Sequence, residues 1–101
     1  MALRAAFIFL APQVNPKVHC QTVETPEVEL TAVAVNNYAE AVEVCKDLAA
    51  QGVAAFELCG GFGTIGAGMI AEALQGKAAV GVVRFDGHPG LGGKSGDELF
   101  K

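Results

Sequence analysis

The sequence predicts a small α/β domain with a mostly parallel sheet of four strands and three helices. Two observations support this class. Apolar, β-branched runs alternate with segments of helical periodicity, as in a chain of βαβ units. The runs are apolar at nearly every residue, which is typical of parallel strands covered on both faces. The chain has 101 residues, a length suited to a single domain.

Four segments have the composition of strands. They are residues 5–10, 28–35, 53–59 and 78–83. With right-handed crossovers between them, we expect the flavodoxin-like order 2-1-3-4, helices on both faces, and a switch point between the first and third strands. Half of a (β/α)8 barrel would show the same alternation and remains the alternative.

Two helices are expected after the second and third strands. The first spans residues 38–51, with Asn37 and Glu40 as a capping box and Gly52 as its stop. The second spans residues 64–75, although its internal glycines, Gly66 and Gly68, each cost about 1 kcal/mol of helix stability relative to Ala.

A third, shorter helix is expected between the first two strands. Asn15 can cap it, Pro16 suits the first helical position, and Thr25-Pro26 would end it. The tail from Asp86 to Lys101 holds five glycines, too many for a helix before Gly96. Leu99 and Phe100 are expected to anchor this tail in a groove of this chain or of a partner.

Composition excludes several classes. Apolar residues make up 51% and charged residues 18%, so disorder is not expected. The net charge is −4 and Lys and Arg do not cluster, which argues against nucleic-acid and anionic-lipid partners. The apolar runs are shorter than the roughly 20 residues of a membrane span. Three cysteines without CxxC spacing, and no convincing signal peptide, favour reduced thiols and a cytoplasmic location.

The clearest motif is the glycine turn, residues 60–66, which follows a predicted strand and opens a predicted helix. It contains Gly61-x-Gly63-x-x-Gly66. Glycines let backbone amides approach an anion, and the helix dipole adds positive potential. We therefore expect a small anionic, phosphorylated metabolite at the carboxyl ends of the strands. The candidate ligand-binding residues are Gln13, Asn15, Gly60, Gly61, Gly63, Thr64, Arg84 and Lys94.

Two nucleotide hypotheses are weaker. Asp86 lies about 20 residues beyond Gly66, as a dinucleotide fingerprint requires, but a full dinucleotide site needs a larger sheet. Residues 88–95 match GxxxxGKS with His in place of the first glycine. A phosphate loop, however, needs a helix behind it and downstream acids that hold magnesium, and only six residues follow Ser95. Turns without a ligand remain the alternative, and no cofactor is identified.

An enzyme of the lyase, isomerase or hydrolase type is a second hypothesis. Asp86 and His88 flank Gly87 at a strand exit, where a carboxylate could orient an imidazole as general base. Cys59, before the glycine turn, is a weaker candidate nucleophile and is otherwise a buried apolar residue. No metal-ligand spacing is present in the sequence. Surface loops and packing explain the same residues without catalysis.

The motifs at residues 57–63 (ELCGGFG) and 82–96 (VVRFDGHPGLGGKSG) resemble those of a family of small microbial proteins of unknown function. Residues 5–12 and 24–28 are similar to it as well. The resemblance implies a compact stand-alone domain and no particular activity. A third hypothesis is an interaction protein, because a small sheet with exposed edges and a glycine-rich arm ending in Leu99-Phe100 suits a homo-oligomer in which the tail packs on a neighbour.

Overall fold

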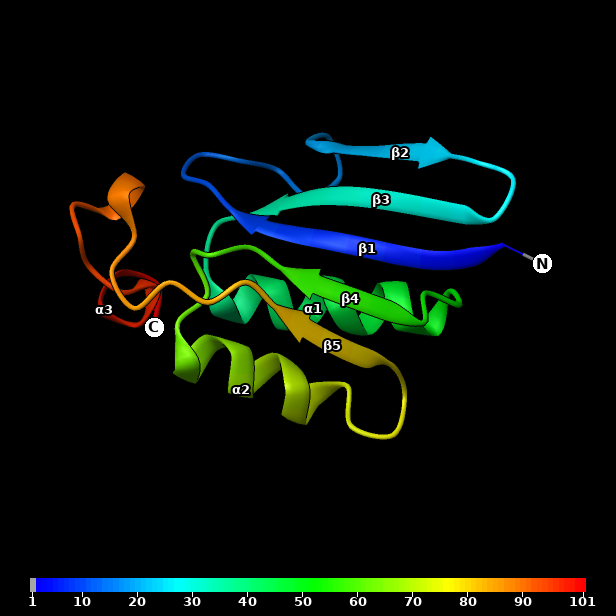
Figure 1. Cartoon of the computed structure of the whole chain (residues 1–101). Coiled ribbons are helices and arrows are strands. Elements are labelled where there is room, and N and C mark those ends of the chain that lie inside the picture. The colour runs from blue at the N-terminus through cyan, green and yellow to red at the C-terminus, as the bar shows by residue number, and fades with distance from the viewer. Residues whose placement is uncertain (1) are drawn as a thin grey trace.

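The computed structural model describes residues 2–101. The elements along the chain are β1 (Leu3–Leu10), β2 (Cys20–Glu24), β3 (Val28–Val35), α1 (Tyr38–Ala50), β4 (Ala55–Leu58), α2 (Thr64–Ala73), β5 (Ala79–Val82), the short 3-10 helix η1 (Pro89–Leu91) and α3 (Gly96–Leu99) (Figure 1). The α/β class is confirmed. The sheet is mostly parallel, as expected, but it has five strands rather than four, and the additional strand is antiparallel.

The sheet has the strand order β2-β3-β1-β4-β5. Strand β1 pairs in parallel with β3 and β4, and β4 pairs in parallel with β5. The four expected strands therefore have the predicted 2-1-3-4 order. Strand β2 joins β3 antiparallel and extends the sheet at one edge.

The prediction of a helix between the first two expected strands is wrong. Asn15 does cap a turn, since its Oδ1 accepts from the Lys17 amide at 3.0 Å, but that turn ends at His19. Residues 20–24 then form β2, because Val23 and the neighbouring Thr22 favour an extended chain that can pair with β3. Thr25 closes the hairpin through bonds of its amide and hydroxyl to the Val28 carbonyl.

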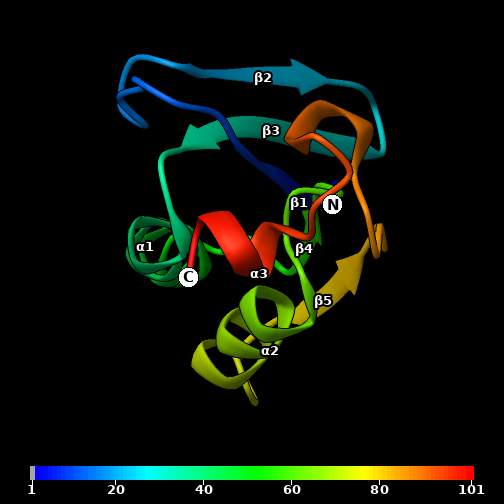
Figure 2. The ribbon, with the colours of Figure 1, turned by 90° about the vertical axis from the view of Figure 1, so that its left-hand side faces the viewer.

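Both long helices lie on the same face of the sheet (Figures 1 and 2). Right-handed crossovers from β3 to β4 and from β4 to β5 move in one direction along the sheet, which places α1 and α2 side by side. The prediction that helices cover both faces of the sheet is therefore wrong, because the segment expected to form the first helix is strand β2. The core lies between the sheet and the helices. It includes Ala6, Ile8, Val33, Val35, Phe56 and Leu58 from the strands, and Ala41, Cys45, Ile70 and Leu74 from the helical side.

Helix α1 begins where the sequence predicts. The Oδ1 atom of Asn37 accepts from the Glu40 amide at 2.8 Å. The Glu40 carboxylate, however, accepts from the backbone and side-chain nitrogens of Asn36, both at 2.8 Å, instead of returning to Asn37. Cys45 faces the core, and burial raises the pKa of its thiol to about 12. Cys45 is therefore a packing residue.

Two glycines in α2 allow the effect of packing on stability to be distinguished from the effect of helix propensity. A Cβ at Gly66 would overlap the ring of Tyr38, whereas a Cβ at Gly68 meets open space. We expect Gly68→Ala to raise the free energy of unfolding by up to about 1 kcal/mol. Gly66→Ala should lower it by about 1–3 kcal/mol, because the tyrosine must move. Urea denaturation of both variants measures this, and equal effects at the two positions would contradict the packing role of Gly66.

Candidate functional site

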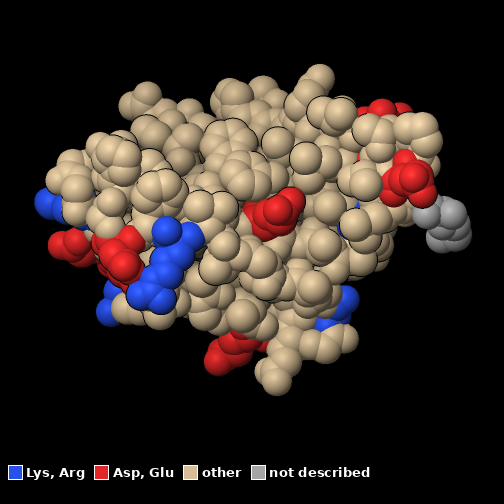
Figure 3. Space-filling model, viewed as in Figure 1, with Lys and Arg blue, Asp and Glu red and all other residues tan. Residues whose placement is uncertain are grey.

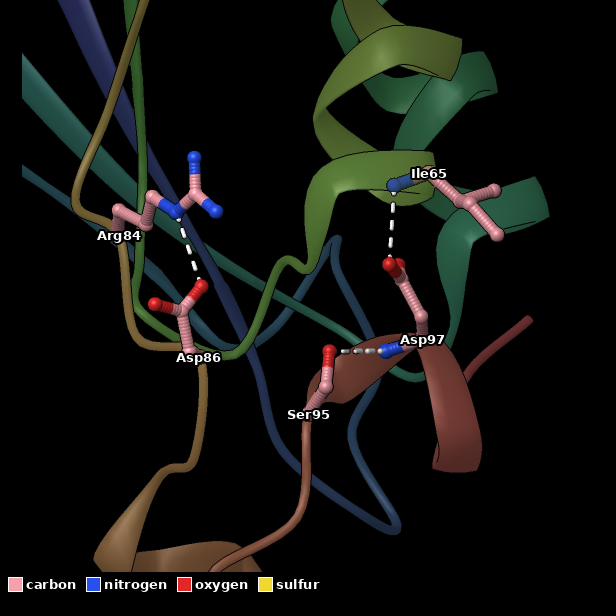
Figure 4. Close-up of polar contacts among 5 residues, drawn as sticks. All are labelled: Ile65, Arg84, Asp86, Ser95 and Asp97. Carbon is pink, nitrogen blue, oxygen red and sulfur yellow. Dashed lines mark hydrogen bonds and ion pairs between the residues drawn. The ribbon is translucent and has the colours of Figure 1, made fainter.

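The glycine turn leads into α2. The N-terminal amides of this helix donate hydrogen bonds to a carboxylate of the same chain. The N-cap is Gly63, which has no side chain to cap the helix. Instead, the Ile65 amide donates to Asp97 Oδ2 at 3.0 Å (Figure 4), and the Gly66 amide donates to Asp97 Oδ1 at 3.1 Å. A carboxylate at this position favourably meets the helix dipole. The helix end that the motif predicts as an anion site thus holds Asp97.

Asp97 is presented by α3, which begins with a capping box. The Ser95 hydroxyl accepts from the Asp97 amide at 3.2 Å (Figure 4). In return, the Glu98 carboxylate accepts from the Ser95 amide at 2.9 Å. Helix α3 begins at Gly96, and before it the tail holds only the short 3-10 helix η1. Of the two expected anchors, Phe100 packs against the core and Leu99 is exposed.

Tyr38 connects Asp97 to the glycine turn. Its hydroxyl donates to Asp97 Oδ1 at 2.9 Å and accepts from the Gly63 amide at 2.9 Å. The ring is 1% exposed and stacks on Phe62, with 5.5 Å between ring centroids. Burial, opposed by the Gly63 hydrogen bond, raises the pKa of Tyr38 to about 12. The tyrosine therefore stays protonated and can donate to the carboxylate.

The Asp97 carboxyl remains ionised in this network. Partial burial raises its pKa, but the hydrogen bonds from Ile65, Gly66 and Tyr38 lower the pKa by more. The pKa of Asp97 is therefore below its usual value of 3.8. Each of those donors stabilises the charged form. The network is thus a fixed anion bound by backbone amides and a phenol.

The glycines of the turn allow this close packing. A Cβ at Gly63 would overlap the Asp97 carboxylate, and a Cβ at Gly96 would overlap the carbonyl oxygen of Gly61. A Cβ at Gly60 would overlap the ring of Phe85. The motif therefore serves contact with the C-terminal segment.

Three of the predicted ligand-binding residues share one pocket. Gly63, Thr64 and Arg84 line a hollow of about 150 Å³ beside α2. The Thr64 amide forms no hydrogen bond within residues 2–101. Arg84 Nε contacts Asp86 Oδ1 at 2.9 Å, and both side chains are mostly exposed (Figure 4).

The predicted catalytic pair is not joined in this structure. Asp86 bonds Arg84, while His88 Nδ1 accepts from the Gly90 amide at 2.9 Å. The His88 ring packs against Phe85, with 4.6 Å between ring centroids. The arrangement makes His88 the N-cap of η1. An imidazole capping its own loop lacks the orienting carboxylate that a general base needs.

The other predicted residues lie in separate places. Cys59 Sγ accepts from the Leu10 and Gly61 amides at 3.4 and 3.3 Å. Gln13 has a φ of 59° in the β1–β2 connection. Asn15 lines a different groove, beside α1. The Lys94 carbonyl accepts from the His88 amide, which closes the loop around η1.

Sequence reasoning missed Tyr38 and Asp97 as site residues. The signal Ser95-x-x-Glu98 marks the start of α3 and could have placed Asp97 in a first helical turn. Nothing local connects it to the Ile65 amide, which is 32 residues away in the chain. Within residues 2–101, no group of three His, Cys, Asp or Glu side chains is arranged to hold a metal ion. No helix in that range is long and apolar enough to cross a membrane.

The fold is a two-layer α/β domain in which the C-terminal segment packs on the glycine turn and caps α2. The chain belongs to a family of unknown function, DUF6506, whose model matches residues 3–98. The family resemblance of the sequence is thereby confirmed. Neither the curated proteins nor the solved structures contain a match to this chain.

Because of the Asp97 network, the free energy of unfolding depends on pH in the acidic range. Since the folded pKa of Asp97 is lowered from 3.8, its ionisation stabilises the fold above that pH, and the contribution is lost as the pH falls through the folded value. We expect Asp97→Asn to lower the free energy of unfolding by about 1–3 kcal/mol at pH 7, because an amide nitrogen faces helix donors.

The difference between wild type and Asp97→Asn should shrink as the pH falls below about 4. Denaturant unfolding from pH 7 to pH 2.5 measures it, with Asp47→Asn on the exposed face of α1 as the control. A difference that does not change with pH would contradict the role of the Asp97 charge.

Proposed function

We propose that this chain is a self-associating interaction domain, in which the uncovered face of the sheet packs on the same face of a second copy. The observation that carries the proposal is an apolar sheet face with no helix on it. The strand register gives its composition. This open face comprises Leu3, Ala5, Phe7, Phe9, Gln21, Val23, Val28, Leu30, Ala32, Ala34, Ala55, Glu57, Ala79 and Gly81.

Large apolar side chains on the open face remain in water. Val23 is 60% and Leu3 is 49% exposed. The Phe7 and Phe9 rings stack beside them, with 6.3 Å between centroids. A hollow of about 310 Å³ at one end, lined in part by Phe9 and Val18, offers space for a side chain of a partner. Figure 3 shows this face free of charge in its middle except for one acidic group.

The open face has the dimensions of an interface. Five strands at about 4.8 Å spacing, the longer ones about 26 Å long, give roughly 500 Å² of sheet. Apolar patches of about 300–600 Å² are the largest on typical monomers and are often functional. A stable interface needs about 800 Å² from each partner. The sheet provides most of this area, and flanking side chains such as Val18 add to it.

A second copy suits this face better than other occupants. A sheet face packs on another sheet face at about 10 Å with interdigitating side chains. A two-fold arrangement needs only that the surface complement itself, which an apolar sheet does. Glu57 is the one charged strand residue on the face. It lies in β4, next to the edge strand β5, where its carboxylate can keep contact with water.

The test is the mass in solution. We expect the wild type to have twice the 10.4 kDa mass of one chain by sedimentation equilibrium, and Phe7→Glu to be monomeric, since it would bury an unpaired carboxylate in the interface. Val23→Lys, at a more exposed position, should weaken the dimer without disturbing the core. Met69→Glu on α2 is the control and should remain dimeric. A monomeric wild type would refute the proposal.

The pocket beside α2 supports a second candidate function, binding of a small anion of phosphate size. It combines the free Thr64 amide with the exposed guanidinium of Arg84. Backbone donors at a helix start and an arginine are the groups that grip phosphate or carboxylate. Asp97 bonds the next two amides, so only this outer position of the helix end is free for a ligand.

Inorganic phosphate is the first ligand to test. We expect its addition to shift the Thr64 amide resonance in a saturable way and Arg84→Gln to abolish the response. Lys46→Gln, on exposed α1, removes the same charge elsewhere and should leave the titration unchanged. An Arg84→Gln variant that still responds would exclude this pocket as the anion site.

A further inference from the structure

The helix layer is one element short beside β2, and this leaves a groove. Helices α1 and α2 do not reach β2, whose five residues are all exposed. The groove between α1 and the β2–β3 hairpin has a volume of about 460 Å³. It lies on the helix side of the sheet, opposite the open face, so a dimer formed through the open face would leave it accessible.

The groove follows one face of α1 over three turns. On the α1 side it is lined by Glu40, Glu43, Val44, Asp47, Leu48 and Gln51. Residues spaced by three and four positions lie above one another on a helix. The distance from Glu40 to Gln51 corresponds to about 16 Å of helix. An occupant of this groove is therefore elongated and runs along α1.

The floor is apolar, the rim on the α1 side is acidic, and Lys17 of the β1–β2 connection is the one basic residue that lines the groove. Val33 contributes to the floor from the sheet, together with Val44 and Leu48 from α1. Glu43 and Asp47 are exposed, one turn apart, and neither forms an ion pair within residues 2–101. Glu40 is already engaged by Asn36. The two free carboxylates favour a partner with positive charges at matching spacing.

We infer that this groove binds an amphipathic basic helix of another protein, about three turns long, with an apolar stripe toward Val44 and Leu48 and Lys or Arg toward Glu43 and Asp47. A helix in this position becomes the missing third member of the helix layer, at the usual 8–10 Å from α1. Lysine and arginine stems also cover apolar surface while their charged ends reach the rim.

The occupant is not a second copy of this chain. Its helices α1, α2 and α3 carry a single basic residue, Lys46, so none presents two positive charges one turn apart. Two copies of α1 would bring Glu43 and Asp47 against like charges, which is unfavourable. Self-association and partner binding therefore use opposite sides of the sheet.

The experiment uses the full chain and a labelled synthetic helix of leucine and lysine, with lysines at positions i and i+4. Binding is measured by fluorescence anisotropy at about 0.15 M salt, where distant charges are screened. We expect the combined Glu43→Lys and Asp47→Lys variant to bind about tenfold or more weakly. A matched double variant, Glu27→Lys with Glu72→Lys, has the same net charge and should lose little affinity.

Two further variants separate this groove from the open face. Val44→Trp fills the groove and should weaken binding, whereas Phe7→Glu on the open face should leave it unchanged. Circular dichroism confirms folding, and Glu43→Gln with Asp47→Asn replaces the reversal variant if that variant unfolds. The inference is overturned if the lysine peptide does not bind, if a glutamate peptide binds equally well, if both double variants lose affinity alike, or if Phe7→Glu abolishes binding.

Discussion

The structure depends most on the carboxylate of Asp97 at the N-terminus of α2. This one group bonds the Ile65 and Gly66 amides and the Tyr38 hydroxyl, which in turn accepts from Gly63. It joins the C-terminal segment, the glycine turn and the start of α1 in a single network. Because the carboxylate supplies the cap that Gly63 cannot, the order of the last residues and the stability of α2 are coupled.

The same interaction explains a motif that resembles a phosphate-binding turn. Glycines allow any chemical group to approach the backbone closely, and here the approaching groups come from the C-terminal segment. The helix dipole is neutralised mainly from within the chain. What remains for an external anion is one amide and the nearby Arg84, a far smaller site than the motif suggests. A glycine-rich turn before a helix thus indicates an anion at the helix end, but it does not distinguish a carboxylate of the same chain from a bound ligand.

A second constraint is the one-sided helix layer. Both crossovers move in the same direction along the sheet, so helices cover one face, and the segment that could have covered the other face forms β2 instead. Two surfaces result from this choice. The open face is apolar, whereas the groove between α1 and the β2–β3 hairpin has an apolar floor and an acidic rim on the α1 side. An interaction domain with a second copy on one side and a basic helix on the other is consistent with both.

Sequence alone determined the elements whose signals are local. The four main strands, their order, the Asn37 start of α1 and the glycine turn before α2 all follow from hydrophobic pattern, capping residues and crossover handedness. Tertiary structure decided the rest. Residues 20–24 become a strand because β3 has a free edge to pair with, and Asp97 caps α2 because folding brings together groups 32 residues apart. Local signals, the β propensity of Thr22 and Val23 and the Ser95-x-x-Glu98 start of α3, allow both outcomes. They do not decide them, because the contacts exist only after the sheet and helices have packed.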